Sequence, residues 1–251
     1  AATAAVSTGV IAEAAYASWR VRPIIRNILP NTKSTEPPIN RKGFLSFYIP
    51  LALSPLLGLA AQPALTAGIS RMPFPMESLA ILPAVNGFTF LFRSVSIAFL
   101  EVVVALIERP GAYSALRRFA WQAAIIVFGI QITIVSTPMA SIWFETISGL
   151  SPTLGNLATT SVCAAITLAS TGFGNSFCQG LLVHSRNTRS ITESVALFLF
   201  VIICGLIVGS IGDWMTGTIF ALLVYSVGQA IQFGWLFFRS HSDRQTHNKA
   251  E

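Results

Sequence analysis

The chain has 251 residues, of which 53% are hydrophobic and only 10% are charged, against roughly 25% charged in ordinary soluble domains. The mean hydropathy is +0.66, the net charge is +6 and the pI is about 9.7. This composition excludes a soluble globular domain. It also argues against nucleic-acid binding, because basic residues of membrane proteins gather in cytoplasmic loops and no soluble face here alternates basic with aromatic residues.

The first segment, residues 1–19, is apolar and rich in small residues, and a basic cluster from Arg20 to Arg26 follows it. A signal peptide carries its positive charge before the apolar run. We therefore expect residues 1–19 to be the end of a transmembrane helix that runs from outside to inside. That would make the chain the C-terminal part of a longer protein; the alternative is a complete seven-helix protein with its N-terminus outside.

Residues 20–43 are basic and polar and contain four prolines. Such a segment does not form a helix in lipid, and we interpret it as a cytoplasmic linker. It is followed by a predicted six-helix bundle at 44–238 and a cytoplasmic tail at 239–251.

The bundle contains six apolar stretches, each long enough to cross about 30 Å of hydrocarbon, for which a helix needs about 20 residues. They are Phe44–Ser70, Ser78–Ile107, Phe119–Trp143, Leu154–Val183, Ile191–Ile211 and Trp214–Phe238. The predicted fold class is an all-α polytopic membrane protein: a six-helix transmembrane bundle preceded by the end of one further membrane helix.

Positive charge alternates from loop to loop. Of the 16 basic residues, 14 fall in the linker, the loops after the second and fourth stretches, or the tail, whereas Arg71 lies on the other side and Arg93 within a stretch. The positive-inside rule then places the linker and the C-terminus in the cytoplasm. We expect a multi-pass protein of the plasma or inner membrane.

Catalytic and metal-binding motifs are not found in the sequence. The three cysteines form no CxxC and no cluster with histidine, and neither GxSxG nor HExxH occurs. We therefore expect neither an enzyme nor a metal or other cofactor.

The second stretch carries the most polarity at membrane depth: Asn86, Arg93 and Glu101. Asn86 and Arg93 are seven residues apart and share a helix face. A charge inside the bilayer costs about 2.5–3.5 kcal/mol and by default indicates a functional site. We predict that Asn86 and Arg93 bind substrate, and that Glu101 takes part in coupling or gating. The alternatives are a structural interhelical bond for Arg93 and an inside-surface position for Glu101.

Two more stretches contribute candidates. The first has Gln62 between prolines, and Pro55 and Pro63 are predicted to bend the helix between about Ala52 and Thr66 and to act in gating. Gln131 of the third stretch and Gln62 are further candidates for substrate binding. For such polar and small residues, close helix packing is the alternative.

Several segments resemble one half of the MATE-type multidrug/oligosaccharidyl-lipid/polysaccharide exporters. They are Gln179–Val183 with the basic Arg186–Arg189 after it, and Glu77–Ala80, Leu91–Ser94 and Val102–Ile107, which are similar to MATE-like and progressive-ankylosis-like transporters. The resemblance implies two six-helix halves joined by a cytoplasmic linker. It also implies alternating access around a central cavity, with an ion gradient as the drive.

The function expected from these features is secondary transport, as one half of a MATE-like exporter. Its partners would be the lipid bilayer, a small-molecule or lipid-like substrate, and the N-terminal half of the same transporter if the chain is a fragment. The alternatives are a flippase for lipid-linked precursors and a non-transporting membrane assembly or scaffold protein. A transporter should have a polar cavity at Arg93, whereas a scaffold should seal every polar side chain against a neighbour.

Overall fold

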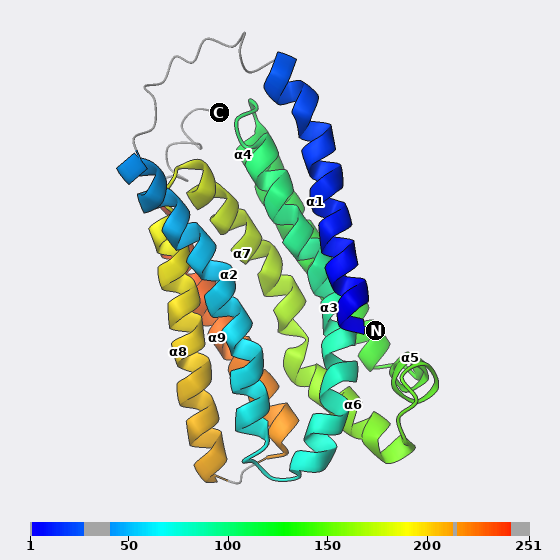
Figure 1. The fold of residues 1–251 in the computed structure, drawn as a ribbon. Helices are drawn as coiled ribbons and strands as arrows, with labels where there is room; N and C mark the ends of the chain where they lie inside the picture. The colour runs from blue at the N-terminus through cyan, green and yellow to red at the C-terminus, as the bar shows by residue number, and fades with distance from the viewer. Residues whose placement is uncertain (1, 28–40, 213–214, 242–251) are drawn as a thin grey trace. The chain divides into compact units, whose positions relative to one another are not determined.

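The computed structural model describes residues 2–27, 41–212 and 215–241, and it divides into two units, 1–44 and 45–251. The described part is built of helices and contains no strand. The helices are α1 (Ala2–Asn27), α2 (Arg41–Ile69), α3 (Pro75–Leu106), α4 (Ala112–Val135), α5 (Met139–Ser141), the π-helical segment η2 (Ile142–Ile147), α6 (Pro152–Ala165), α7 (Thr167–His184), α8 (Thr188–Gly212) and α9 (Gly217–Arg239) (Figure 1).

The first unit contains α1, which continues past residue 19 through the basic cluster to Asn27, with Pro23 inside it. The first eight residues of the predicted linker are therefore helical. Among the described residues, α1 is not one of the helices apolar enough to cross a membrane; even its arginine-free part is rich in Ala, Ser and Thr and contains Glu13. Its role as the end of a preceding span stays a prediction. Residues 28–40 of the linker and 242–251 of the tail lie outside the described residues.

The second unit contains six membrane-length apolar spans, as predicted. They are Tyr48–Ile69 of α2, then α3, α4, the combined Pro152–His184 of α6 and α7, α8 and α9. The chain is therefore an all-α, polytopic integral membrane protein.

The third span is displaced from its predicted position. The sequence predicts it at Phe119–Trp143, but α4 occupies Ala112–Val135, and α5 and η2 follow as a separate short segment. Pro138 explains the earlier end, because proline has no N–H to donate and its ring clashes with the carbonyl four residues back. The positive φ of 71° at Gly111 marks the chain reversal where α4 begins.

Proline behaves differently in α2, which continues without interruption from Arg41 to Ile69 although Pro50, Pro55 and Pro63 lie inside it. The break occurs instead in the fourth span, at Ile166 between α6 and α7, where Figure 1 shows a bend. Helix bounds do not measure a bend, so the bend predicted at Pro55 and Pro63 stays a prediction, whereas the predicted fourth stretch agrees with the span Pro152–His184.

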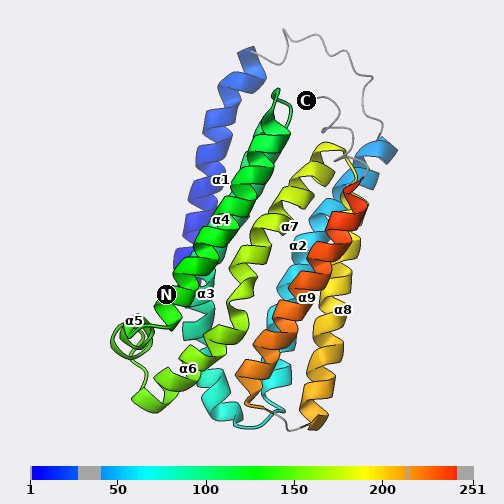
Figure 2. The same cartoon turned by 180° about the vertical axis from the view of Figure 1, so that it is seen from behind.

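Successive spans of the second unit alternate in direction (Figures 1 and 2). The loops after α3 and α7 and the end of α9 therefore lie at one end of the bundle. We call this end the basic end; it carries Arg109, Arg117, Arg118, Arg186, Arg189 and Arg239. In the loops at the opposite end, the described residues include a single basic residue, Arg71. This arrangement agrees with the loop-charge pattern, while the cytoplasmic assignment of the basic end stays a prediction.

The helix α3 packs along α7. Val103 of α3 and Leu181 of α7 are both almost completely buried in the same cluster. A Cβ added at Gly180 of α7 would lie 2.5 Å from a methyl carbon of Val103, so glycine permits this close approach. A second cluster packs α2 against α8, and a third packs α3 against α6.

Candidate functional site

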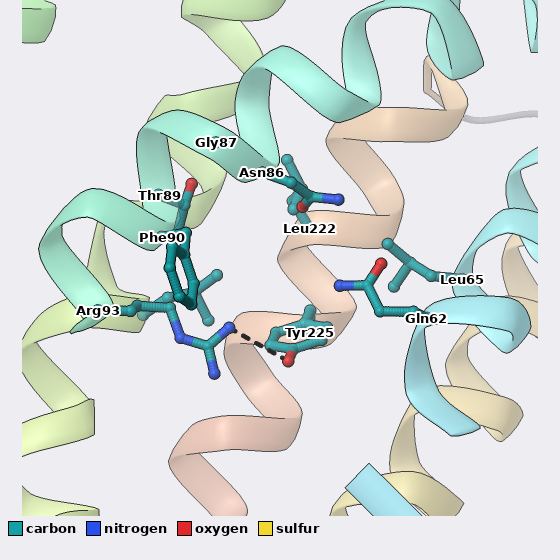
Figure 3. Close-up of a pocket in the computed structure, with 10 residues that line it drawn as sticks. Gln62, Leu65, Asn86, Gly87, Thr89, Phe90, Arg93, Leu222 and Tyr225 are labelled. Carbon is teal, nitrogen blue, oxygen red and sulfur yellow. Dashed lines mark hydrogen bonds between the residues drawn. The ribbon is translucent and has the colours of Figure 1, made fainter. Parts of the chain in front are cut away.

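A pocket of about 420 Å³ opens between α2, α3 and α9 near the middle of the spans. Its volume lies within the usual range for small-molecule sites, roughly 300–1,000 Å³. The residues that line it are Gln62, Leu65, Asn86, Gly87, Thr89, Phe90, Arg93, Leu168, Leu222 and Tyr225 (Figure 3). Three of the four residues predicted to bind substrate, on two different helices, therefore meet here.

Hydrogen bonds between helices hold α3 on both sides of the pocket residues. The Thr218 hydroxyl of α9 donates to the Ser78 carbonyl at 2.8 Å. At the other end, the Ser176 hydroxyl of α7 donates to the Ser96 carbonyl at 2.5 Å. Because bonds at positions 78 and 96 bracket the polar stretch, the face of α3 that carries Asn86 and Arg93 has a set orientation.

Arg93 lies near the centre of α3, about 4 Å from the midpoint of a helix about 48 Å long. Its Nη1 donates to the Tyr225 hydroxyl of α9 at 3.3 Å, and its Cζ lies 5.6 Å from the centre of the Tyr225 ring. The hydrogen bond is longer than the usual 2.7–3.2 Å, and the ring distance is within the about 6 Å typical of cation–π contacts. Within the described part of the chain, the Arg93 guanidinium is therefore held only by the Tyr225 side chain.

The Tyr225 ring is itself fixed in place. It packs edge-on against Phe198 of α8, with the ring centroids 5.0 Å apart. The next residue, Ser226, donates its hydroxyl to the Ala164 carbonyl of α6 at 2.7 Å. Contacts with α8 and α6 thus fix this part of α9, and Tyr225 in turn positions the Arg93 guanidinium.

The other polar side chains face the same space. Figure 3 shows Gln62 of α2 and Asn86 of α3 pointing toward the region beside Tyr225 and Arg93. The Thr89 hydroxyl is used locally, donating to the Val85 carbonyl at 2.8 Å. The described residues that line the pocket include no carboxylate. The pocket therefore carries one positive charge and two amides, which suits an anionic or strongly polar group.

The remaining walls are apolar. Leu65, Leu168 and Leu222 are almost completely buried, whereas Phe90 at the rim is 61% exposed. A ligand with both a polar and an apolar part would match this lining.

The other predicted site residues lie elsewhere. Gln131 of α4 is completely buried away from the pocket, and neither of its amide atoms has a hydrogen-bond partner among the described residues. Glu101 is exposed on α3 and forms no ion pair within the described part of the chain. Pro55 and Pro63 are exposed on α2. Of these four, none lines the pocket, and their roles stay predictions.

Sequence reasoning missed Tyr225, which contacts Arg93 across 132 positions of the chain. One signal was available: Tyr225 lies four residues before Gln229 and seven before Gln232, so the three share one face of a mainly apolar helix. The described residues hold no group of three or more His, Cys, Asp or Glu side chains arranged to bind a metal ion.

Comparison with known proteins gave no match to a family model, to a curated protein or to a solved structure. The geometry of the pocket is therefore the basis on which function is considered.

Proposed function

We propose that this membrane protein is a transporter, one half of a MATE-like secondary exporter working by alternating access, and that the Arg93 pocket binds an anionic or polar group of its substrate. The observation that carries this proposal is the position of the Arg93 guanidinium. It lies near the middle of its span and lines a pocket together with Gln62 and Asn86.

A structural role alone accounts poorly for Arg93. Placing an arginine at bilayer depth costs about 2.5–3.5 kcal/mol on insertion scales. Guanidinium has five N–H donors, yet among the described residues only Nη1 finds a side-chain acceptor, the Tyr225 hydroxyl. The unused donors face a pocket rather than a carboxylate, which favours a ligand over a structural ion pair.

The same observation favours transport over a scaffold. A static assembly protein should cover its intramembrane polar groups with neighbours, whereas Gln62 is exposed and Asn86 and Arg93 are half-buried at the pocket. Six alternating spans with basic residues at one end also agree with the half-transporter organisation that the resemblance implies.

A flippase for a lipid-linked precursor is the second candidate. The exposed Phe90 at the rim and the leucine walls favour a substrate with an apolar part next to its anionic group. Both candidates share the Arg93 contact and differ in the size of the cargo.

The test uses sealed inside-out membrane vesicles that contain the protein encoded by the complete reading frame. Uptake of carboxyfluorescein, an amphipathic anion, is compared with uptake of rhodamine 6G, an amphipathic cation, and with movement of a fluorescent polyprenyl phosphate between leaflets. We expect anion uptake or polyprenyl phosphate movement, abolished by Arg93→Ala with normal membrane abundance. If all three rates equal those of empty vesicles, the proposal is wrong.

A further inference from the structure

A second cavity, separate from the Arg93 pocket, lies between α4, α7 and α9 and has a volume of about 490 Å³. Figure 2 shows these three helices side by side. We call it the lateral cleft, and its lining includes Arg117, Trp121, Ala124, Ser170, Phe177 and Phe233.

The one charged side chain that lines the cleft, Arg117, lies toward its basic end. On α4, Arg117 lies about one turn deeper than Tyr113, which also lines the cleft, and Ala124 lies about 10 Å deeper than Arg117 along the helix axis. On the antiparallel α7, Phe177 is nearer the basic end and Ser170 lies about 10 Å deeper. Half of a hydrocarbon core is about 15 Å thick. The cleft therefore spans most of one leaflet, with its cation toward the basic end of the cleft.

Arg117 lacks the carboxylate partner that two other arginines at this end possess. Arg239 and Arg189 both bind Glu193, at 2.7 Å and 3.2 Å. Arg117 instead contacts the Tyr113 ring, whose centre lies 5.6 Å from its Cζ, and within the described residues it forms no ion pair. Its charge at the mouth of the cleft is therefore available to an anion.

The body of the cleft suits an apolar chain. Small side chains such as Ala124 leave the space open, while Phe177 and Phe233 form its walls. Trp121 at the rim is 66% exposed, a position typical of tryptophan at the level of lipid headgroups. The walls beyond Arg117 are mainly apolar, with the Ser170 and Thr171 hydroxyls at the deep end, so an occupant should be anionic at the basic end and mainly hydrocarbon beyond it.

We propose that the lateral cleft is a binding site for one anionic phospholipid of the cytoplasmic leaflet, with its phosphate on Arg117 and an acyl chain between α4, α7 and α9. The basic end faces that leaflet under the loop-charge topology, and anionic lipids are enriched there. The site is independent of whether the Arg93 pocket transports a substrate.

The test is native mass spectrometry of the purified chain, titrated with dioleoylphosphatidylglycerol or dioleoylphosphatidylcholine. We expect the wild type to bind the anionic lipid at least tenfold more tightly than the neutral one. Arg117→Gln should remove this preference, and Arg117→Lys should keep most of it. The matched control is Arg118→Gln, an adjacent exposed arginine that does not line the cleft.

A second variant tests the apolar part. Ala124→Phe should fill the cleft and weaken binding of both lipids, and a photoreactive benzoylphenylalanine in place of Trp121 should crosslink to phosphatidylglycerol. Equal affinity for the two lipids, an equal loss in Arg117→Gln and Arg118→Gln, or crosslinking to a protein segment or a second copy instead of lipid would each overturn the proposal.

Discussion

Replacement of Arg93 by alanine should weaken binding of an anionic ligand without lowering the stability of the protein. Within the described chain, the substitution removes one long hydrogen bond and one cation–π interaction, both with Tyr225. Together they contribute about 1–2 kcal/mol. Removing the charge from the bilayer offsets this by about 2.5–3.5 kcal/mol. We therefore expect Arg93→Ala to leave the apparent Tm of the purified protein unchanged or slightly raised.

Binding of an anion should respond in the opposite way. One charge-assisted hydrogen bond is worth about 1.5–3 kcal/mol, which corresponds to roughly 10- to 150-fold in affinity. Arg93→Ala should weaken carboxyfluorescein binding, measured by fluorescence polarisation in detergent, by at least tenfold. Arg93→Lys keeps the charge and loses the planar fork, so its affinity should fall between those of the wild type and Arg93→Ala.

Two results would refute this reasoning. Wild-type dye affinity in Arg93→Ala would show that Arg93 does not bind the anion. A large fall in apparent Tm for both Arg93→Ala and Arg93→Lys would show that Arg93 holds the helices together and that the alternative, structural interpretation is correct.

Other substitutions test the helix contacts and the topology. Tyr225→Phe keeps the ring against Phe198 and loses only the hydroxyl acceptor, so its apparent Tm should change little, and dye affinity should change less than threefold; a loss equal to that of Arg93→Ala would place the hydroxyl in ligand binding. Gly180→Ala should lower stability by about 1–3 kcal/mol in a detergent-denaturation assay, because the new methyl meets a stiff valine of α3, whereas Gly129→Ala, with nothing within 4 Å, should not; equal effects would contradict the close packing. A single cysteine at Ser148 should react with an impermeant thiol reagent added outside sealed cells, whereas a single cysteine at Ser242 should react only after lysis. The reverse pattern would invert the topology.

The membrane spans could be predicted from the sequence because their length and apolarity are local properties. All six were found, and the basic loops lie at one end of the second unit. The third span was displaced, and the helix boundaries depend on backbone details that packing decides. Pro138 ended α4, whereas Pro55 and Pro63 left α2 continuous, and the fourth span broke at Ile166, where the sequence has no proline.

The site could be predicted only in part for the same reason. Asn86 and Arg93 lie on one helix, so their shared face follows from helical periodicity. The meeting of Gln62 with Arg93, and above all the contact with Tyr225, depends on how α2 and α9 pack against α3. Gln131 has the same chemistry as Gln62, but α4 contributes no residue to the pocket and Gln131 is buried elsewhere.

A water-accessible and positively charged pocket at membrane depth is tested most directly by thiol labelling of Asn86→Cys in a chain without its three native cysteines. Val95→Cys is the matched control, because it lies on the opposite face of α3 and as far from the helix midpoint, about 7 Å, with an exposed side chain outside the pocket. We predict that an anionic methanethiosulfonate modifies Asn86→Cys faster than a cationic one, that Arg93→Ala removes this preference, and that Val95→Cys remains unmodified. Equal labelling of both positions, or a preference at Asn86→Cys that survives Arg93→Ala, would contradict the presence of such a pocket.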